Sequence, residues 1–399
     1  MRALPPALSL LLAACTGTPA TPADMRTPDA APAVSDAATA LRDAAAPRDA
    51  RAAALDAALA RVVAADPSVP GVLLAVRAPG FTYAGAAGRA RLRGRPLAPT
   101  DLFRAASVTK TFVAAAALVL VERGTLRLDE PIAARLTPAT AAALRADGYA
   151  TDVITLRQLL GHTAGVFDYT EAPSFYATLL LDPTHRWTRA EQIALAMSEG
   201  RRQNAPGAAY HYGDTHYLLA AEIIEVATGR PLAAALRELL QFERLGLTDT
   251  WLESLEPAPA DAAARFTHPY IEDTDTRGWD PSWDLFGGGG LVSSTRDLVR
   301  FFDALFAPEG GVFTRPETRA TFTTMPAVGR GAFFGIDGGL GINRLRVDGV
   351  ECYAGYGFFT TQAVHCPALD LTFAATLNQA EPRDDEAIIE AVLSIVPAR

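Results

Sequence analysis

Ser107 and Lys110 are the two residues whose types and spacing point most directly to chemistry. They stand three positions apart, so a helix would bring both side chains to one face. A serine hydroxyl becomes a good nucleophile when a base removes its proton, and lysine can be that base if burial disfavours its ammonium form. Arginine cannot, because its guanidinium keeps its proton in proteins. Of the 36 Lys and Arg residues, 35 are arginine and the single lysine is Lys110. We therefore interpret the pair as a nucleophile and its base.

The segment that follows Lys110 predicts a buried helix that would position this pair. Residues 111–121 are apolar on every face of a helix, and they are too few to cross a bilayer, which needs roughly 20 residues. The start of this helix would hold Ser107 at the positive end of the helix dipole, where backbone N–H groups favour a developing anion.

A second candidate segment runs from Pro206 to Tyr217 and leads into a helix that begins at Thr215. Tyr212 could accept the serine proton as a phenolate if a lysine lowers its pKa, and Asp214, two positions later, could hydrogen-bond a substrate amide. Asp214 directly before Thr215 also fits a helix N-cap. Both interpretations of Asp214 stay open on these residues alone.

Four segments together resemble the penicillin-recognising serine hydrolases, in particular the group of class C β-lactamases, D-alanyl-D-alanine carboxypeptidases and related esterases. They are Ser107-Val-Thr-Lys110, residues 159–165, residues 206–229 and residues 287–298. The resemblance runs from about residue 55 to residue 398. It implies an acyl-enzyme route in which Ser107 attacks a carbonyl, Lys110 and Tyr212 relay its proton, and water releases the acyl group. It also implies no metal, no cofactor, and a small-molecule or peptide acyl substrate.

Two departures from this family pattern bear on the substrate. The second motif is usually Tyr-x-Asn, and here its third residue is Asp214, which cannot donate a hydrogen bond when it is ionised. The third motif, Lys-Thr-Gly or His-x-Gly, aligns with Gly355-Tyr356-Gly357, or in a shifted register with Tyr353-Ala354-Gly355, and neither contains a cation. The missing cation weakens the case for a peptidase or lactamase and favours an ester or another uncharged acyl substrate.

The strand of the third motif can still supply backbone donors to the site. The N–H of Phe358, after Gly357, together with the N–H of Ser107 is expected to form the oxyanion hole, which needs no particular side chain. The leading hypothesis is thus a serine hydrolase of the β-lactamase or carboxypeptidase type. The alternatives are an esterase of the same fold, or a non-catalytic homologue that binds cell-wall peptide or another ligand.

Other polar and small residues are predicted to be structural. His162, His211 and His216 show no short two-ligand spacing, so no zinc site is expected. The glycines at 287–290 lack the following lysine of a phosphate-binding loop.

Cys352 and Cys366 are expected to remain unbridged. If residues 357–366 form one strand, that strand alone would span about 30 Å at roughly 3.3 Å per residue, which is too far for a disulfide.

The order of predicted elements indicates an α/β fold. A helix is predicted over residues 53–65, followed by two strands over 71–77 and 81–88. The middle of the chain is predicted to be helical, over 107–122, 156–160, 188–199, 215–228, 232–239 and 295–306. Strands are predicted near the end, over 341–347, 357–366 and 369–377, before a final helix over 384–396. We expect an antiparallel sheet built from both chain ends and flanked by the N- and C-terminal helices, with a mainly helical region inserted at about 103–300.

The first 15 residues have the form of a secretion signal, with a positive charge, a short apolar stretch and small residues before Cys15. Leu-Ala-Ala-Cys resembles the lipobox of bacterial lipoproteins, in which the cysteine is acylated. The other interpretation is an ordinary signal peptide with a chance cysteine. Residues 16–50, rich in Ala, Pro and Thr, read as a disordered tether to a hydrolase domain over 51–399.

Composition limits the partners of the chain. A formal net charge of −9 without any basic run argues against nucleic-acid binding. We expect an exported monomer, periplasmic or at the cell surface, that touches a membrane only through a lipid on Cys15.

Overall fold

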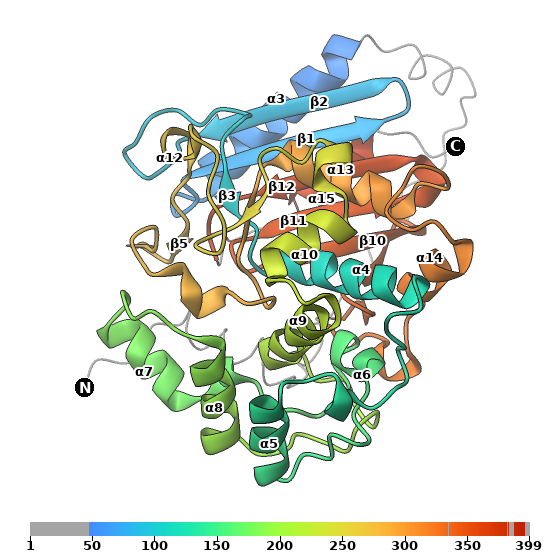
Figure 1. Ribbon diagram of the computed structural model, residues 1–399. Helices are drawn as coiled ribbons and strands as arrows, with labels where there is room; N and C mark the ends of the chain where they lie inside the picture. Colours follow the sequence, from blue (N-terminus) through green and yellow to red (C-terminus); the bar gives the residue numbers. More distant parts are fainter. Residues whose placement is uncertain (1–47, 334, 381, 383–386, 396–399) are drawn as a thin grey trace, which may run out of the picture.

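A seven-stranded antiparallel sheet forms the centre of the protein (Figure 1). The computed structural model describes residues 48–333, 335–380, 382 and 387–395, so the predicted signal, most of the predicted tether and Cys15 lie outside the described residues. The sheet order is β2-β1-β12-β11-β10-β9-β8. The strands are β1 (Gly71–Ala78), β2 (Phe81–Gly88), β8 (Asp337–Gly338), β9 (Asn343–Val347), β10 (Val350–Gly357), β11 (Thr361–Cys366) and β12 (Leu371–Thr376). Early and late strands therefore share one sheet, as the sequence predicted.

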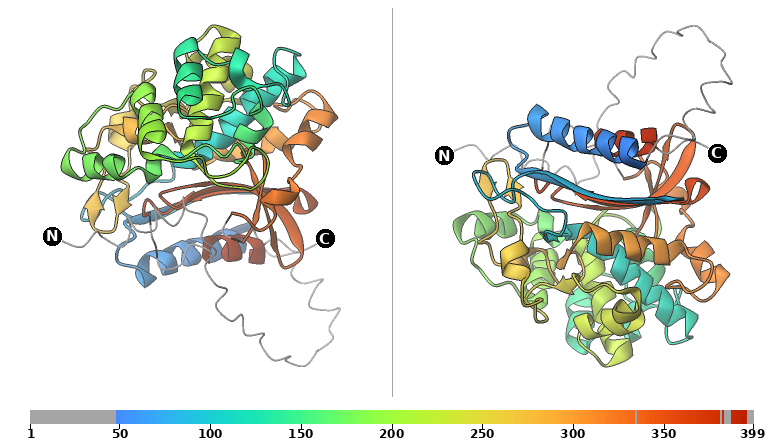
Figure 2. Two further views of the ribbon diagram at one scale, coloured as in Figure 1. Left: turned by 90° about the horizontal axis from the view of Figure 1, so that it is seen from below. Right: turned by 90° about the horizontal axis from the view of Figure 1, so that it is seen from above.

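Helices cover both faces of this sheet (Figure 2). On one face α3 (Arg48–Ala65) packs with α15 (Ala387–Ile395) over an apolar core that includes Leu55, Val72 and Phe373. On the other face lie α13 (Thr295–Phe306) and α4 (Thr109–Glu122). The α/β architecture with flanking terminal helices is confirmed.

Between β2 and β8 the chain is mainly helical. The remaining helices are α5 (Pro138–Ala146), α6 (Leu156–Leu160), α7 (Pro173–Leu181), α8 (Arg189–Glu199), α9 (Asp214–Thr228), α10 (Leu232–Leu239), α11 (Phe242–Leu245), α12 (Ala262–Arg265) and α14 (Pro316–Phe322). Short strands form two small sheets: β3 (Phe103–Arg104), β7 (Leu291–Ser293) and β4 (Trp251–Leu252) in one, β5 (Tyr270–Ile271) and β6 (Thr274–Asp275) in the other. None of the helices that the structure describes is long and apolar enough to span a membrane.

Helix α4 is the central element of the helical region. Its residues from Thr109 to Leu120 are all buried, because apolar side chains point outward on every side and meet α9, α10 and the sheet. Ser107 lies just before it, on a single 3₁₀ turn (Ala106–Val108) rather than in the α-helix itself. Ala106 has a φ of 46°, a left-handed conformation that is uncommon outside glycine, so the chain bends sharply directly before Ser107.

The end of the sheet differs from the sequence prediction. Residues 357–366 are not one strand: β10 ends at Gly357, the chain turns, and β11 begins at Thr361. This hairpin places Cys352 directly opposite Cys366, with a Cα–Cα distance of 4.2 Å, and the two are joined by a disulfide. The prediction of two unbridged cysteines was wrong because it treated as extended a segment that folds back on itself.

Candidate active site

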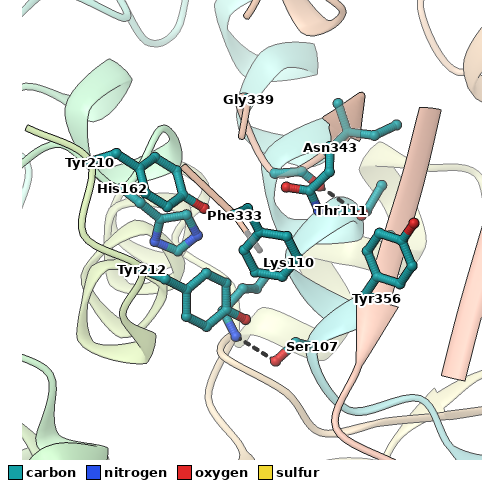
Figure 3. Close-up of a pocket in the computed structure, with 13 residues that line it drawn as sticks. Ser107, Lys110, Thr111, His162, Tyr210, Tyr212, Phe333, Gly339, Asn343 and Tyr356 are labelled. Atoms are coloured by element: carbon teal, nitrogen blue, oxygen red, sulfur yellow. Dashed lines mark hydrogen bonds between the residues drawn. The ribbon is translucent and has the colours of Figure 1, made fainter. Parts of the chain in front are cut away.

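Ser107 and Lys110 meet as the sequence predicted. Lys110 Nζ lies 2.8 Å from Ser107 Oγ, and the lysine side chain projects from the first turn of α4 toward the serine on the preceding 3₁₀ turn (Figure 3). Because the apolar faces of α4 are enclosed on all sides, the lysine has no route to bulk solvent along the helix, and only 3% of the residue is exposed.

Two further oxygen partners hold the lysine ammonium. Nζ donates to the carbonyl of Gly288 at 2.6 Å and forms an ion pair with Asp214 Oδ1. Burial opposes the ammonium, but the nearby charges, Asp214 first among them, outweigh it, so the pKa of Lys110 lies above its ordinary value. The expectation of a lysine whose burial favours the free amine is therefore wrong for the resting site, and the reason is the carboxylate of Asp214.

Tyr212, the third residue that the sequence predicted for the catalytic group, lies beside Lys110. Its ring lies beside the ammonium, with Lys110 Nζ 4.9 Å from the ring centroid. Burial raises the pKa of Tyr212, and the positive charge of Lys110 only partly offsets this, so the side chain is a neutral phenol near pH 7. The lysine lowers the tyrosine pKa in the expected direction, but not far enough to give a phenolate at rest.

Asp214 does not cap a helix. The N-cap of α9 is Gly213, no side chain caps it, and Asp214 is the first helical residue with its carboxylate turned to Lys110. Of the two interpretations that the sequence left open, the N-cap is excluded.

Gly288 and Gly289 lie between two carboxylates, which explains the glycine run. A Cβ on Gly288 would stand 3.0 Å from Cγ of Asp214, and a Cβ on Gly289 would stand 2.1 Å from Oδ1 of Asp284. Only glycine leaves room for this approach. The glycines therefore let the backbone pass close to Lys110 and the two acids.

The sequence did not identify Asp284, although it lies just before the glycine run. Burial and the charge of Asp214 raise the pKa of Asp284 to about 7. The same two causes raise the pKa of Asp168, which precedes α7, to about 6. Neither acid forms a recognisable motif with Lys110 in the chain, because each comes from a separate loop.

Strand β10 runs past the start of α4. A Cβ on Gly355 would stand 2.8 Å from Thr111 Oγ1, and a Cβ on Gly357 would stand 2.3 Å from the carbonyl oxygen of Ala105. Both glycines thus permit the strand to lie against the segment that carries Ser107. Phe358 lies beyond the strand, in the turn, with its ring centroid 6.1 Å from that of Trp283.

The register of β10 fixes the direction of its N–H groups. The 4.2 Å Cα–Cα distance of Cys352 and Cys366 is typical of a non-hydrogen-bonded pair, for which about 4.5 Å is expected. Because this pattern alternates, Ala354 and Tyr356 also direct their N–H groups away from β11. On the side of β10 away from β11 lies β9, and its pairing with β10 ends at Ala354. The N–H of Tyr356 therefore has no β9 partner beside it and points toward the cavity.

An open cavity lies beside Ser107. Most of its wall is aromatic or backbone. It is lined by Ser107, Lys110, Thr111, His162, Tyr210, Tyr212, Phe333, Gly339, Gly341, Ile342, Asn343, Gly355 and Tyr356 (Figure 3). Phe333 and Asn343 had no motif to reveal them in the sequence.

His162 and His216 are packed against each other as neutral rings. Nδ1 of His162 lies 3.3 Å from Nδ1 of His216, and burial lowers the pKa of both, that of His216 to about 3. His211 instead contacts Glu171 at 2.8 Å. Over the described residues no cluster of His, Cys, Asp and Glu could hold a metal ion.

A family model described as beta-lactamase matches residues 22–396 of the chain. The chain belongs to the β-lactamase family. It is accordingly a serine hydrolase of the β-lactamase fold, as the resemblance of its motifs implied. Within this family, esterase EstB of Burkholderia gladioli is 31% identical over 294 residues, which cover 66% of this chain and 71% of that protein.

Two further proteins that this chain is similar to carry names of different kinds. Penicillin-binding protein 4* of Bacillus subtilis (strain 168) is 27% identical over 251 residues, and the match spans 59% of this chain but only 52% of that relative. The solved structure of a D-stereospecific amidohydrolase from Streptomyces sp. superposes with a TM-score of 0.73 at 28% identity, covering 85% of this chain and 98% of that one. The fold is therefore shared along most of the chain, while the names of these relatives cover more than one substrate class.

Proposed function

We propose that this β-lactamase-family protein hydrolyses esters or amides that carry no carboxylate on either side of the scissile bond, through an acyl-enzyme on Ser107. One observation carries the proposal: of the side chains that line the cavity in the described part of the chain, only Lys110 is charged, and Asp214 neutralises it. A substrate carboxylate would find no cation to replace its hydration. The 31% sequence identity to an esterase and the structural similarity to an amidohydrolase both support this substrate class.

Acylation begins with a proton transfer inside the Lys110–Asp214 ion pair. The ammonium passes one proton to the Asp214 carboxylate, and the resulting amine accepts the proton of Ser107 Oγ as that oxygen bonds to the substrate carbonyl carbon. The serine proton thus ends within the pair, and no charge leaves the buried site. This proton path makes Asp214 a catalytic participant rather than a ligand for a substrate amide.

The tetrahedral oxyanion is held by the N–H groups of Ser107 and Tyr356. The second donor is Tyr356 rather than Phe358, because the β10 register directs the Tyr356 N–H to the cavity and Phe358 packs on Trp283. The Tyr212 hydroxyl protonates the leaving oxygen or nitrogen and regains a proton from Lys110. Water then attacks the acyl carbon, and the same groups act in reverse.

The direct test compares three substrates under one condition: p-nitrophenyl acetate, nitrocefin and a D-alanyl-D-alanine peptide. Ester turnover is expected to exceed peptide or lactam turnover by at least about 10²-fold in kcat/KM, because the last two present a carboxylate to a site without a free cation. Ser107→Ala is the control and should show no turnover. Equal or faster release of D-alanine would overturn the proposed substrate class.

The same experiment separates an enzyme from the non-catalytic homologue. Multiple turnovers of the ester per protein molecule are expected. A release of one equivalent that then stops would instead favour a binding protein that traps its ligand on Ser107.

We also propose that the protein is exported and anchored by a lipid on Cys15. The disulfide between Cys352 and Cys366 supports export, because such bonds persist in oxidising compartments, and it leaves Cys15 as the one cysteine of the sequence outside the bridge. Cys15→Ser is expected to move the protein from the membrane fraction to the soluble periplasmic or extracellular fraction. A variant that stays with the membrane would contradict the lipid anchor.

A further inference from the structure

His162 lies in the wall of the cavity beside Ser107, deep inside the protein. Only 3% of the residue is exposed, yet it is one of the residues that line the cavity. Its ring lies between those of Tyr210 and Tyr212, with centroid separations of 5.6 Å and 4.4 Å (Figure 3). Packing on both sides therefore holds the ring in place.

One nitrogen of this ring is already engaged by the protein. The backbone N–H of Gly213 donates to Nδ1 of His162 at 3.2 Å, so Nδ1 is an acceptor and carries no proton. Burial lowers the pKa of His162 well below its ordinary value, which keeps the ring neutral near pH 7. A neutral imidazole whose Nδ1 accepts a hydrogen bond carries its proton on Nε2.

The other nitrogen offers this proton to the cavity. In the part of the chain that the structure describes, neither Nε2 of His162 nor the hydroxyl of Tyr210 forms a hydrogen bond. Both side chains line the same cavity, and the Tyr210 hydroxyl lies on the cavity side of its ring (Figure 3). Because an unpaired donor at a buried position is costly, this pair is suited to an acceptor that a ligand supplies.

These two donors lie on the side of the site from which the leaving group departs. The His162 ring packs on Tyr212, whose hydroxyl protonates the leaving atom in the proposed reaction. The carbonyl oxygen of the substrate is directed elsewhere, to the N–H groups of Ser107 and Tyr356. A chain attached to the leaving atom would therefore extend past His162 and Tyr210.

We propose that the Nε2–H of His162 and the hydroxyl of Tyr210 bind an uncharged acceptor oxygen in the leaving group of the substrate. The preferred substrates are esters of alcohols that carry a second oxygen, such as glycol ethers and polyols, and the corresponding amides. This inference rests on the proposed function and specifies the leaving group. A neutral oxygen suits the subsite, because a neutral N–H supplies a hydrogen bond without the positive charge that a buried carboxylate needs.

The test uses pairs of acetate esters in which an ether oxygen replaces a methylene: 2-methoxyethyl against butyl acetate, and 3-methoxypropyl against pentyl acetate. Every ester gives the same acetyl-enzyme on Ser107, so kcat/KM compares only binding and acylation. Each kcat/KM is divided by the rate constant of hydroxide hydrolysis, which removes the intrinsic effect of the ether oxygen. The better ether is expected to exceed its alkyl partner by about tenfold, because the alkyl chain leaves Nε2–H unpaired.

His162→Asn separates the donor from the packing role of the ring. Asparagine tolerates the φ of 54° at this position, and its Oδ1 can accept the Gly213 N–H as Nδ1 does, but its shorter side chain places no donor where Nε2 lies. The ether-to-alkyl ratio is expected to fall by at least about threefold, whereas a purely structural defect would lower both rates together. Tyr210→Phe, which removes only a hydroxyl, should lower the ratio in the same direction.

His365→Asn is the matched control. His365 is also buried, and its Nδ1 lies 2.8 Å from Thr372 Oγ1, but it belongs to β11 and does not line the cavity. This variant should keep the wild-type ratio. A second control moves the oxygen to the acyl side: ethyl methoxyacetate should show no comparable advantage over ethyl butanoate after the same correction.

The outcomes separate this inference from the proposed function. Equal corrected rates within both pairs of acetates, or turnover of p-nitrophenyl acetate without turnover of either ether ester, would overturn the inference and leave an esterase in place. No turnover of any ester, p-nitrophenyl acetate included, would overturn the proposed function itself. A preference that survives both His162→Asn and Tyr210→Phe would exclude these two donors, and an equal preference on the acyl side would exclude the leaving group as the part that they bind.

Discussion

Lys110→Arg is expected to lower acylation of Ser107 by at least about 10³-fold while the protein still folds. The substitution keeps the positive charge that Asp214 and the carbonyl of Gly288 bind. It removes the proton transfer, because a guanidinium cannot give up its proton and then accept that of Ser107. The measurement is the initial burst of p-nitrophenol and the labelling of Ser107 by a fluorophosphonate, at equal concentrations of folded protein.

Lys110→Met serves as the comparison. It removes the charge and leaves Asp214 unpaired in the interior, so it should lower the free energy of unfolding as well as the rate. Lys110→Arg should unfold near the wild-type denaturant midpoint and yet remain unlabelled. An arginine variant that acylates within about tenfold of the wild-type rate would show that Lys110 only supplies charge, and the proton path through the ion pair would have to be abandoned.

The sequence predicted those parts of the site that lie close together along the chain. The spacing of Ser107 and Lys110 depends only on helix geometry, and the apolar run after them has one way to be buried, so the helix over 109–122 followed directly. The helices over 156–160, 232–239 and 295–306 were also predicted to the residue, because their apolar periodicity and end signals agree.

The sequence failed where function depends on contacts between distant segments. Asp214 next to Thr215 looked like a helix cap, and only the fold shows that its carboxylate pairs with Lys110, about one hundred residues earlier. Because of this ion pair the side chain of Lys110 is an ammonium ion, whereas the sequence predicted a free amine. The sequence did not single out Asp284 for the same reason, because only the fold places its carboxylate against Gly289, next to the Lys110–Asp214 pair.

The hairpin at the end of the sheet shows a different kind of failure. The segment from Val350 to Cys366 is rich in strand-forming residues on both sides of Gly357, so local pattern gave no clear turn. Missing that turn separated Cys352 from Cys366 by the length of a strand. It also left the register of the third motif undecided between Gly355-Tyr356-Gly357 and Tyr353-Ala354-Gly355, and the pairing of β10 with its neighbours favours the second.

Asp214→Asn is expected to lower kcat/KM for the ester by about 10²-fold at pH 7, even though it restores the usual residue of the family motif. The amide can still occupy the space beside Gly288, but it cannot take a proton from Lys110. Removing the carboxylate also removes the largest influence that raises the lysine pKa, so the pKa of Lys110 falls. The free amine is then present at lower pH than in the wild-type protein, and it can act as the base by itself.

The pH profile therefore carries the decisive information about Asp214. In the variant the deficit should shrink as the pH rises, because a growing fraction of Lys110 has lost its proton to solvent, whereas the wild-type protein needs no such loss. Asp214→Glu, which keeps a carboxylate at a slightly different distance, should retain the wild-type shape of the profile at a reduced rate. If Asp214→Asn instead lowers the rate by one constant factor at every pH, Asp214 orients Lys110 without exchanging a proton with it, and acylation must draw its base from Tyr212.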